Sequence, residues 1–232
     1  RYSEELGRPF RLEATVVATK PDIKPEKLIG ENVTIRLTTG GPSKERHFNG
    51  IVCRVSQSAD FHTEPEYTLT IVPAVWLLTK FSDCRIFPPQ SSPEDVFKKI
   101  FEKVGLSSGG TINGVKAKYE YCVQSRETDF DFVSRLLEEE GIAFHFEHTD
   151  KQIVFVMSDT DSGMLRLEPF DALGADVRGR QLEDLRMGAR LRPTRVKLVE
   201  YNWQKPKLDM GNEKKGDAEE LFVEKYPGRF HE

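Results

Sequence analysis

The chain has 232 residues and a mass of 26.5 kDa, enough for one large or two ordinary domains with a sizeable buried core. Its 34 Lys and Arg residues against 38 Asp and Glu residues give a formal net charge of -4. The chain as a whole therefore lacks the basic surface of a nucleic-acid-binding protein. The longest apolar run, at residues 71–78, contains Pro73 and is far shorter than the ~20 residues of a membrane-spanning helix, so no such segment is expected.

The three cysteines, Cys53, Cys84 and Cys122, are widely spaced and include no CxxC pair that would indicate zinc binding or redox chemistry. An odd number of cysteines at wide spacing favours a reducing compartment. Because the chain begins at Arg1 rather than Met, we expect it to be a piece of a longer protein whose own start is not seen here.

Strand-like alternation dominates residues 1–90. Apolar and polar residues alternate at positions 33–37, 51–55 and 67–71, the period of a strand with one buried face. A long, turn-rich loop is predicted between the first two strands, at residues 39–50. Pro73 interrupts the third strand, so residues 75–78 are predicted to form a separate strand or an edge strand. Short antiparallel strands in this number predict a barrel or a sandwich.

Two helices are predicted in the middle of the chain. Ser92 caps the first helix, Pro93 lies in its first turn, and Gly105 closes it. Thr128 caps the second helix, with Asp131 three residues later in a variant of the capping box. The apolar face of this second helix, which ends at Gly141, is formed by Phe130, Phe132, Val133, Leu136 and Leu137.

Alternation around these helices predicts strands at residues 115–124, 142–147 and 153–157, with a loop at 107–114. Helices and strands together indicate an α+β unit in this part of the chain.

The last third is basic over a short stretch. Residues 178–197 contain seven basic and two acidic residues, a local charge of +5. This pattern is compatible with a nucleic-acid-binding arm, but the interleaved leucines favour a structured or partner-facing surface. A strand is predicted near residues 196–201 and a helix near 221–226, which Pro227 and Gly228 would stop. We therefore expect the second all-β unit to be incomplete within this sequence.

His145 and His148 are candidate metal ligands. Residues three apart on a regular strand point to opposite faces, so both cannot bind one ion, and two ordinary strand histidines are the favoured interpretation.

Glu138, Glu139 and Glu140 are candidate acid/base residues. Adjacent helix residues diverge around the axis, whereas acid/base catalysis needs two carboxylates that converge on one substrate. Arg135 can pair with Glu138 or Glu139, which favours a solvated face. Acids at a helix C-terminus oppose the macrodipole, so a contact with a partner is the alternative interpretation.

No GxSxG, HExxH, Walker or GxGxxG motif is present, and Gly40-Gly41 and Gly109-Gly110 are interpreted as loop glycines. We therefore predict no catalytic, cofactor-binding or metal-binding residues, and no enzymatic activity.

The stretch from Tyr121 to Ile142, YCVQSRETDFDFVSRLLEEEGI, closely resembles the VgrG family of type VI secretion spike proteins, which are related to the hub and late-control proteins of contractile phage tails. The likeness extends over most of the chain. Other matching stretches are Phe48-Asn49-Gly50-Ile51-Val52, Leu69-Thr70-Ile71-Val72-Pro73-Ala74, Trp76-Leu77-Leu78, Arg85-Ile86-Phe87, Val199-Glu200-Tyr201-Asn202-Trp203-Gln204-Lys205-Pro206 and Tyr226-Pro227-Gly228.

The resemblance implies a mainly β fold, with antiparallel β-barrels of the phage tail hub type and a small α+β domain. It places a first β-barrel at residues 1–88, the α+β domain at 89–175, and the start of an incomplete second β-barrel at 176–232.

It further implies a structural hub that assembles as a homotrimer, forms a pseudo-sixfold ring and docks on the hexameric Hcp tube. The other implied partners are baseplate components, and effectors or adaptors bound through C-terminal regions outside this chain. Neither nucleic acid nor a cofactor is implied. Such a protein would assemble in the bacterial cytoplasm and leave through the type VI apparatus.

The competing hypothesis is an envelope polysaccharide-processing enzyme or a lectin-like part of a phage-tail-like particle. It requires converging carboxylates or an aromatic platform in a groove. The two tryptophans, Trp76 and Trp203, each lie in a strand-like run instead.

Overall fold

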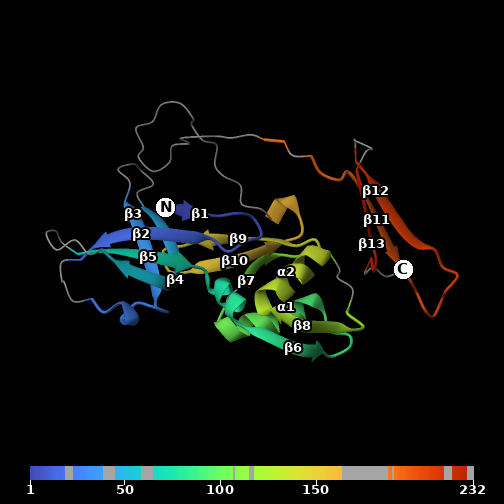
Figure 1. Cartoon of the computed structure of the whole chain (residues 1–232), viewed down its shortest axis with the longest axis horizontal. Helices are drawn as coiled ribbons and strands as arrows, with labels where there is room; N and C mark the ends of the chain where they lie inside the picture. The colour runs from blue at the N-terminus through green and yellow to red at the C-terminus, as the bar shows by residue number, and fades with distance from the viewer. Residues whose placement is uncertain are drawn as a thin grey trace. The chain divides into compact units, whose positions relative to one another are not determined.

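A computed structural model describes residues 1–18, 23–38, 45–58, 65–106, 108–114, 118–163, 188–189, 191–216 and 221–228. The chain divides into two compact units, Arg1–Gln181 and Leu182–Glu232. Strands predominate in both units, and the helices lie in the first (Figure 1). The mainly β fold with an α+β part is thus confirmed.

The first unit opens with a curled, five-stranded antiparallel sheet. Its strands are β1 (Tyr2–Ser3), β2 (Arg11–Val17), β3 (Asn32–Thr38), β4 (Glu45–Gln57) and β5 (Glu66–Val72), in the order β1-β2-β5-β4-β3. A short 3-10 helix, Pro25–Lys27, precedes β3. The three strands predicted from alternation are confirmed as β3, β4 and β5.

The predicted loop at residues 39–50 is wrong in its second half. Strand β4 already begins at Glu45, because residues 45–51 pair with β3, while residues 39–44 lie outside the described part of the chain. The pairing of β4 with β5 shifts register between Val52 and Arg54, which places Cys53 at a β-bulge.

Gly50 lets β4 approach its neighbours closely. A β-carbon added there would lie 2.6 Å from the Cγ2 atom of Ile71 and 2.8 Å from the carbonyl oxygen of Val72. The glycine of the Phe48-Asn49-Gly50 motif is therefore required by backbone packing.

Residues 75–78 do not form the predicted strand. They belong to a 3-10 helix, Ala74–Lys80, which Pro73 precedes. Val75 and Leu78 are its buried residues, and their spacing of three matches the three residues per turn of a 3-10 helix. The buried residues of this apolar run are thus spaced as in a helix rather than as in a strand.

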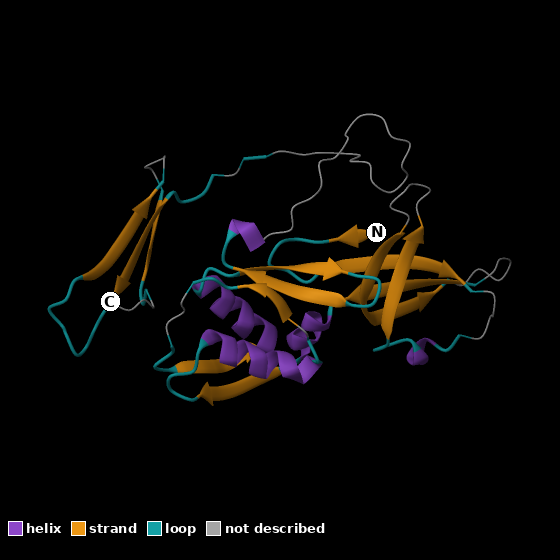
Figure 2. Ribbon diagram, turned by 180° about the vertical axis from the view of Figure 1, so that it is seen from behind, coloured by secondary structure: helices purple, strands orange, loops and turns teal. Residues whose placement is uncertain are grey.

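The α+β part consists of two helices between a sheet and a two-stranded ribbon (Figure 2). The helices are α1 (Pro93–Phe101), which continues as the 3-10 turn Glu102–Val104, and α2 (Asp129–Glu139). The sheet, in the order β7-β10-β9, contains β7 (Ser108–Thr111), β9 (Ala143–His148) and β10 (Ile153–Ser158), and a further 3-10 turn, Asp161–Gly163, follows it. The ribbon pairs β6 (Ser82–Phe87) with β8 (Cys122–Thr128).

Both helix starts are confirmed. Ser92 and Asp95 form a reciprocal capping box, and the Thr128 Oγ1 atom accepts a hydrogen bond from the backbone N–H of Asp131. Gly105 and Gly141 follow the helices with φ of 60° and 67°, the left-handed conformation that glycine adopts readily.

Aromatic rings connect the layers of this α+β part. Phe132 of α2 stacks on Phe87 of the ribbon at a centroid distance of 5.5 Å, and Phe101 of α1 meets Phe155 of β10 edge-on at 5.3 Å. The predicted apolar face of α2 is buried, except that Phe130 is half-buried.

Two predictions near β7 and β8 are wrong. The predicted loop at residues 107–114 contains β7, whose Gly110 has φ of 98° and lies so close to the Met157 backbone that a side chain would not fit. The predicted strand at 115–124 is displaced toward the C-terminus and inverted, since Cys122 and Gln124 are buried and Tyr121 is exposed. Tyr119 makes an isolated bridge to Ser91, and residues 115–117 lie outside the described part.

The second unit contains a three-stranded sheet of β11 (Arg195–Glu200), β12 (Met210–Lys215) and β13 (Phe222–Lys225), in the order β12-β11-β13. The predicted strand near 196–201 is confirmed as β11. The predicted helix at 221–226 is wrong, because residues 222–225 pair in parallel with β11. Most of the basic stretch 178–197 lies outside the described residues.

Across the described ranges, none of the helices combines the length and apolar character needed to cross a membrane. Cys53 and Cys84 are free thiols.

Candidate functional site

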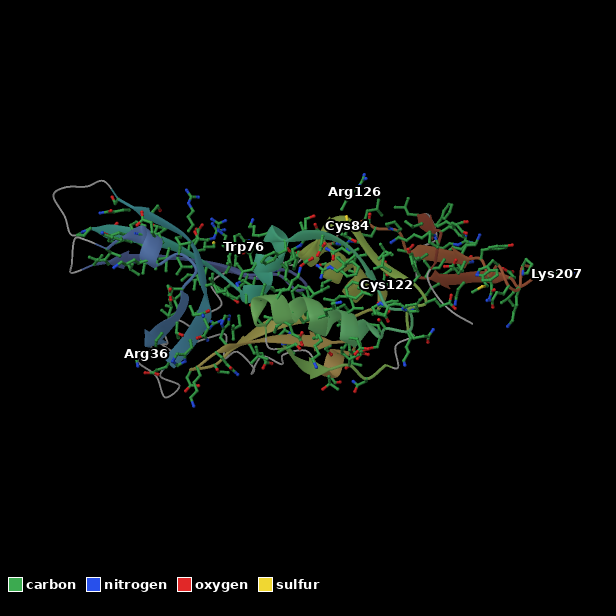
Figure 3. The ribbon with its side chains drawn as sticks, turned by 90° about the horizontal axis from the view of Figure 1, so that it is seen from below. Arg36, Trp76, Cys84, Cys122, Arg126 and Lys207 are labelled. Atoms are coloured by element: carbon green, nitrogen blue, oxygen red, sulfur yellow. The ribbon has the colours of Figure 1, made fainter. Side chains whose placement is uncertain are left out.

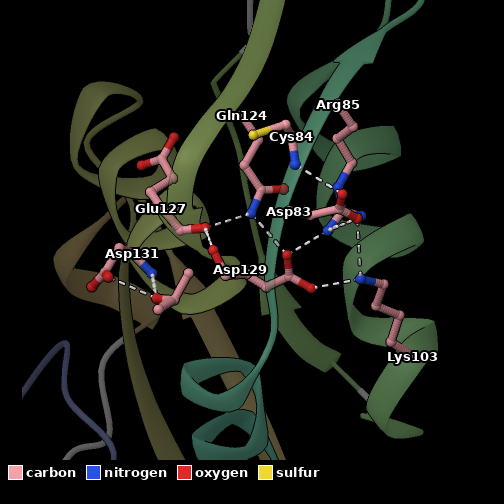
Figure 4. A network of polar contacts seen from close by, with 10 residues as sticks. Asp83, Cys84, Arg85, Lys103, Gln124, Glu127, Asp129 and Asp131 are labelled. Carbon is pink, nitrogen blue, oxygen red and sulfur yellow. Dashed lines mark hydrogen bonds and ion pairs between the residues drawn. The ribbon is translucent and has the colours of Figure 1, made fainter.

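A buried carboxylate, Asp129, joins the ribbon to both helices (Figure 4). Its side chain is 0% exposed and lies in the first turn of α2. Lys103 Nζ donates to Oδ2 at 2.8 Å, Gln124 Nε2 donates to Oδ1 at 2.8 Å, and Arg85 donates to Oδ1 as well. The donors come from β6, β8 and the turn after α1, so one carboxylate fixes three elements to the start of α2.

Asp83 extends this network. Its carboxylate lies 3.4 Å from the Arg85 guanidinium and 3.9 Å from the Lys103 ammonium. Two acids therefore face two bases beneath the ribbon, and the charges of the network balance.

The electrostatics keep Asp129 ionised. Burial acts to raise the pKa of its carboxyl group, but hydrogen bonds from Lys103, Gln124 and Arg85 outweigh burial and hold the pKa below its usual value. A carboxylate that is ionised, covered and satisfied in this way is suited to holding structure rather than to donating a proton at neutral pH.

The outer face of the ribbon exposes large apolar side chains. Ile86 is 64% exposed and Tyr121 is 71% exposed, and Cys84 is exposed on the same strand as Ile86. Figure 3 shows the labelled Cys84 and Arg126 near each other at the outer margin, with Cys122 further inside. We call Cys84, Ile86, Tyr121 and Arg126 the ribbon surface, and it is the candidate contact surface of this unit.

Arg126 has an unusual backbone. Its φ is 55°, and it is skipped in the β6–β8 register between Ser125, which pairs with Cys84, and Glu127, which pairs with Asp83. A non-glycine residue in the left-handed region costs about 1 kcal/mol or more, and bulges redirect side chains. The bulge at Arg126 is therefore part of the ribbon surface.

Two of the three glutamates at the end of α2, Glu139 and Glu140, have partners within the unit. Arg135 lies 2.7 Å from Glu127 and 3.5 Å from Glu139, and Tyr119 donates its hydroxyl to Glu140 Oε1 at 3.0 Å. The pairing of Arg135 with Glu139 agrees with the predicted helical spacing. These acids are thus held apart by different partners and do not converge on one point.

His145 and His148 occupy different surroundings on β9. The His148 ring packs against the rings of Tyr2, Phe10 and Phe48, with centroid distances of 5.9, 5.2 and 5.6 Å. The His145 Nε2 atom lies 3.6 Å from Glu147 Oε1 instead. Over the described part of the chain, no group of three or more His, Cys, Asp and Glu side chains is arranged to hold a metal ion.

Asn49 clasps the β9–β10 hairpin to the five-stranded sheet. Its side-chain Nδ2 donates to the carbonyl oxygens of Thr149 at 2.8 Å and Gln152 at 3.1 Å, and its Oδ1 accepts from Thr34 at 2.7 Å. Buried amides of this kind are costly unless every group is satisfied. The middle residue of the Phe48-Asn49-Gly50 motif thus connects the two sheets.

A groove of about 420 Å³ lies beside α1. Its floor includes Phe97, Phe101 and Met157, and its acids are Glu94 and Glu102. Eight positions on a helix correspond to a rise of about 12 Å, whereas paired acids of glycoside hydrolases lie about 5 to 9.5 Å apart. The groove resembles a small binding pocket in volume, but the backbone positions of its two acids are farther apart than the carboxyl groups of a catalytic pair.

Sequence patterns missed both connecting residues. Asp129 bonds to Lys103 and Arg85 across 26 and 44 positions of the chain, and Asn49 bonds to the carbonyl of Gln152 across 103 positions. Neither helical nor strand periodicity reaches that far. The only sequence signal for Asp129 was its place as an acid at the first position of a capped helix. A favourable interaction with the helix dipole explains such an acid equally well.

Comparison with known proteins gives consistent matches. The profile of a family described as the phage tail baseplate hub (GPD) matches residues 3–232. The type VI secretion system spike protein VgrG1a of Pseudomonas aeruginosa is 38% identical over 211 residues, covering 88% of this chain and 32% of that protein. Spike protein VgrG3 of Vibrio cholerae is 26% identical over 85% of this chain and 20% of that protein. The chain therefore spans about a third or less of these relatives.

Solved structures agree on the fold. An Escherichia coli protein, c3393, described as a component of the type VI secretion system with similarity to phage T4 tail proteins gp27 and gp5, superposes with a TM-score of 0.63 and 27% identity. The match covers 70% of this chain and 45% of that protein. A prophage tail protein of Shewanella oneidensis gives a TM-score of 0.51 at 16% identity over 93% of this chain and 63% of that one, which supports the fold alone.

Proposed function

The chain belongs to the phage tail baseplate hub family, and from this premise we propose that it is the structural hub segment of a type VI secretion spike. The observation that carries the proposal is the 38% identity to a VgrG spike protein over 88% of the chain. The resemblance identified in the stretch from Tyr121 to Ile142 is the same one.

In this proposal three copies of the longer protein form a ring with approximate sixfold symmetry that docks on the hexameric Hcp tube. In such a ring, one surface of each chain contacts a different surface of the next copy. When a threefold rotation repeats this contact, the ring closes and no surface is left unpaired at an end. Two similar barrels per chain then supply the six positions that a hexamer presents. The division into a first barrel at 1–88, an α+β domain at 89–175 and the start of a second barrel at 176–232 is part of this proposal.

The proposed partners are further copies of this chain, the Hcp tube and baseplate components, with effectors or adaptors bound through regions beyond this segment. The protein would assemble in the bacterial cytoplasm and be exported by the type VI apparatus, as a spike component must.

A scaffold role without catalysis fits the chemistry of the first unit. Asp129, a fully buried carboxylate, is neutralised by two cations, and Glu139 and Glu140 each have their own partner. These ion pairs and hydrogen bonds hold the helices and strands of the unit together, as a part that is driven through a cell envelope requires.

Light scattering on a longer protein, extended to include the rest of the hub and the needle, tests the assembly. A mass of three chains is expected. A persistent monomer at micromolar concentration would contradict the trimer and with it the ring.

The groove beside α1 is the observation that favours the alternative, an envelope polysaccharide-processing enzyme. Glu94→Gln, Glu102→Gln, Glu139→Gln and Glu140→Gln separate the two in an envelope-hydrolysis assay. Loss of turnover in a variant that keeps its fold would favour the enzyme, whereas the scaffold account expects no turnover from any of these proteins, wild type included.

A further inference from the structure

His148 sits where three segments meet. Strand β5 pairs with β4 only from Ile51 onward, so the backbone N–H of Asn49 lies just beyond the end of that pairing. It donates instead to the His148 Nδ1 atom at 3.0 Å. The histidine thus completes the edge of β4 in place of a strand.

The other ring nitrogen faces the N-terminal segment. His148 Nε2 lies 3.2 Å from the Tyr2 hydroxyl, and the Tyr2 hydroxyl donates to Glu4 Oε2 at 2.8 Å. Because Nδ1 accepts from a backbone N–H, the ring proton must reside on Nε2, from which it is donated to Tyr2. The chain of hydrogen bonds from His148 through Tyr2 to Glu4 has one consistent direction and requires a neutral imidazole.

We propose that protonation of His148 releases the β9–β10 hairpin from β4, so that the first unit contains an acid-sensitive joint between its five-stranded and three-stranded sheets. A second ring proton would be placed on Nδ1, directly facing the Asn49 N–H. Two donors would then oppose each other across a half-buried contact, and a buried donor without an acceptor is unfavourable. The neighbouring side-chain contacts of Asn49 with the hairpin would weaken with it.

The ring is kept neutral by its burial rather than by its charged and titratable neighbours. They are Tyr2 and Glu4 from the N-terminal segment and Arg46 from β4, while Phe10 and Phe48 cover the ring with apolar surface. Burial lowers the pKa of His148 and Arg46 adds to this, whereas Glu4 acts in the opposite direction without reversing it. Burial, with the acidic neighbour, also raises the pKa of Tyr2, which keeps its hydroxyl protonated as the donor to Glu4.

Acid should favour the open state of the joint, because His148 has different pKa values in the closed and open states. The folded protein holds His148 with a pKa below that of the unfolded chain, so the open state binds more protons and acid favours it. The joint is closed above about pH 6.5, the ordinary pKa of histidine, and loosens as the pH falls below that value. The opening equilibrium constant should rise by up to about tenfold per pH unit in this range.

Amide hydrogen exchange of the whole chain, followed by NMR between about pH 8 and about pH 5, tests the joint. The protection factor of the Asn49 amide should fall relative to that of Val52, whose N–H on the same strand donates to Glu31. In His148→Gln the side-chain oxygen can still accept from Asn49 but does not titrate, so the pH dependence should vanish. His145→Gln, a matched change on the same strand, should leave it as in the wild type.

Constant protection of Asn49 across this range in the wild type would overturn the proposal, as would a pH dependence that persists in His148→Gln. Should that variant fail to fold, nitrogen-15 shifts of the wild-type imidazole decide the matter. The proposal requires a protonated Nε2 and a bare Nδ1 at about pH 8, and the reverse tautomer would refute it. None of these readings depends on the proposed assembly.

Discussion

Replacing Asp129 with Asn removes the charge at the centre of the network beneath the ribbon. The change keeps the size of the side chain but leaves Arg85, whose side chain is 15% exposed, next to a neutral amide. Breaking a buried ion pair by removing one partner typically costs 3 to about 5 kcal/mol, because the other charge stays buried.

The structure places Asp129→Asn near the lower end of that range. Lys103 is 35% exposed and can turn toward water, and Asp83 remains 3.4 Å from Arg85 to offset part of its charge. We therefore expect the free energy of unfolding of the first unit to fall by about 3 kcal/mol.

Asp131→Asn is the matched control. Asp131 lies in the same first turn of α2 and makes the same change of charge, but it is exposed and bonds to the hydroxyl of Thr128 at 2.7 Å. Loss of this contact and of its interaction with the helix dipole should cost about 1 kcal/mol or less.

Urea denaturation followed by tryptophan fluorescence measures both variants. Trp76 lies in the first unit and Trp203 in the second, so a Trp203→Phe background reports on the first unit alone. The midpoint should shift at unchanged m-value. If Asp129→Asn and Asp131→Asn shift it by the same small amount, the network does not hold the unit together and the reasoning fails.

Three further predictions concern the stability of the first unit. Leu137→Ala should lower stability by roughly 2 to 5 kcal/mol, as for a buried leucine, and a neutral result in the same denaturation would mean that this face of α2 is not packed. Gly50→Ala should cost about 1 to 3 kcal/mol because its methyl group would press on Ile71 and Val72; folding at wild-type stability would show that β4 can move away. Because the folded pKa of Asp129 is lowered, its stabilisation is present above about pH 3.9, the unfolded value, and is lost as the pH falls through the folded one. Acid denaturation should therefore be less steep below about pH 4 in Asp129→Asn, and an unchanged slope would contradict the assigned shift.

Local rules predicted the parts of the fold that local chemistry determines. Ser92 and Thr128 mark helix starts because their hydroxyls satisfy backbone N–H groups within the same turn, so the evidence lies within four residues. The strands β3, β5 and β9 were identifiable because apolar and polar residues alternate along them with the period of a strand.

The failures share a physical cause. Residues 75–78 are all apolar, so the sequence does not distinguish a strand from a helix there. The burial of Val75 and Leu78, three positions apart, is what identifies the 3-10 helix. Residues 222–225 have a plausible helical pattern, but pairing with β11 overrides it. Gly110 was interpreted as a loop residue, although its missing side chain is what allows β7 to approach Met157.

The candidate site was the least predictable feature. The stretch from Tyr121 to Ile142 was identified as distinctive, yet its central residue, Asp129, is explained by Arg85 and Lys103, which lie elsewhere in the sequence. The positive φ of Arg126 has no sequence signature, because arginine rarely adopts it.

Electron microscopy of the full-length protein tests the central claim most directly. If this segment is scaffolding for a secretion spike, the particles should show a ring of about six lobes, two from each of three chains, carried on a thin needle. Single-chain particles without a ring, or rings of another symmetry, would contradict it.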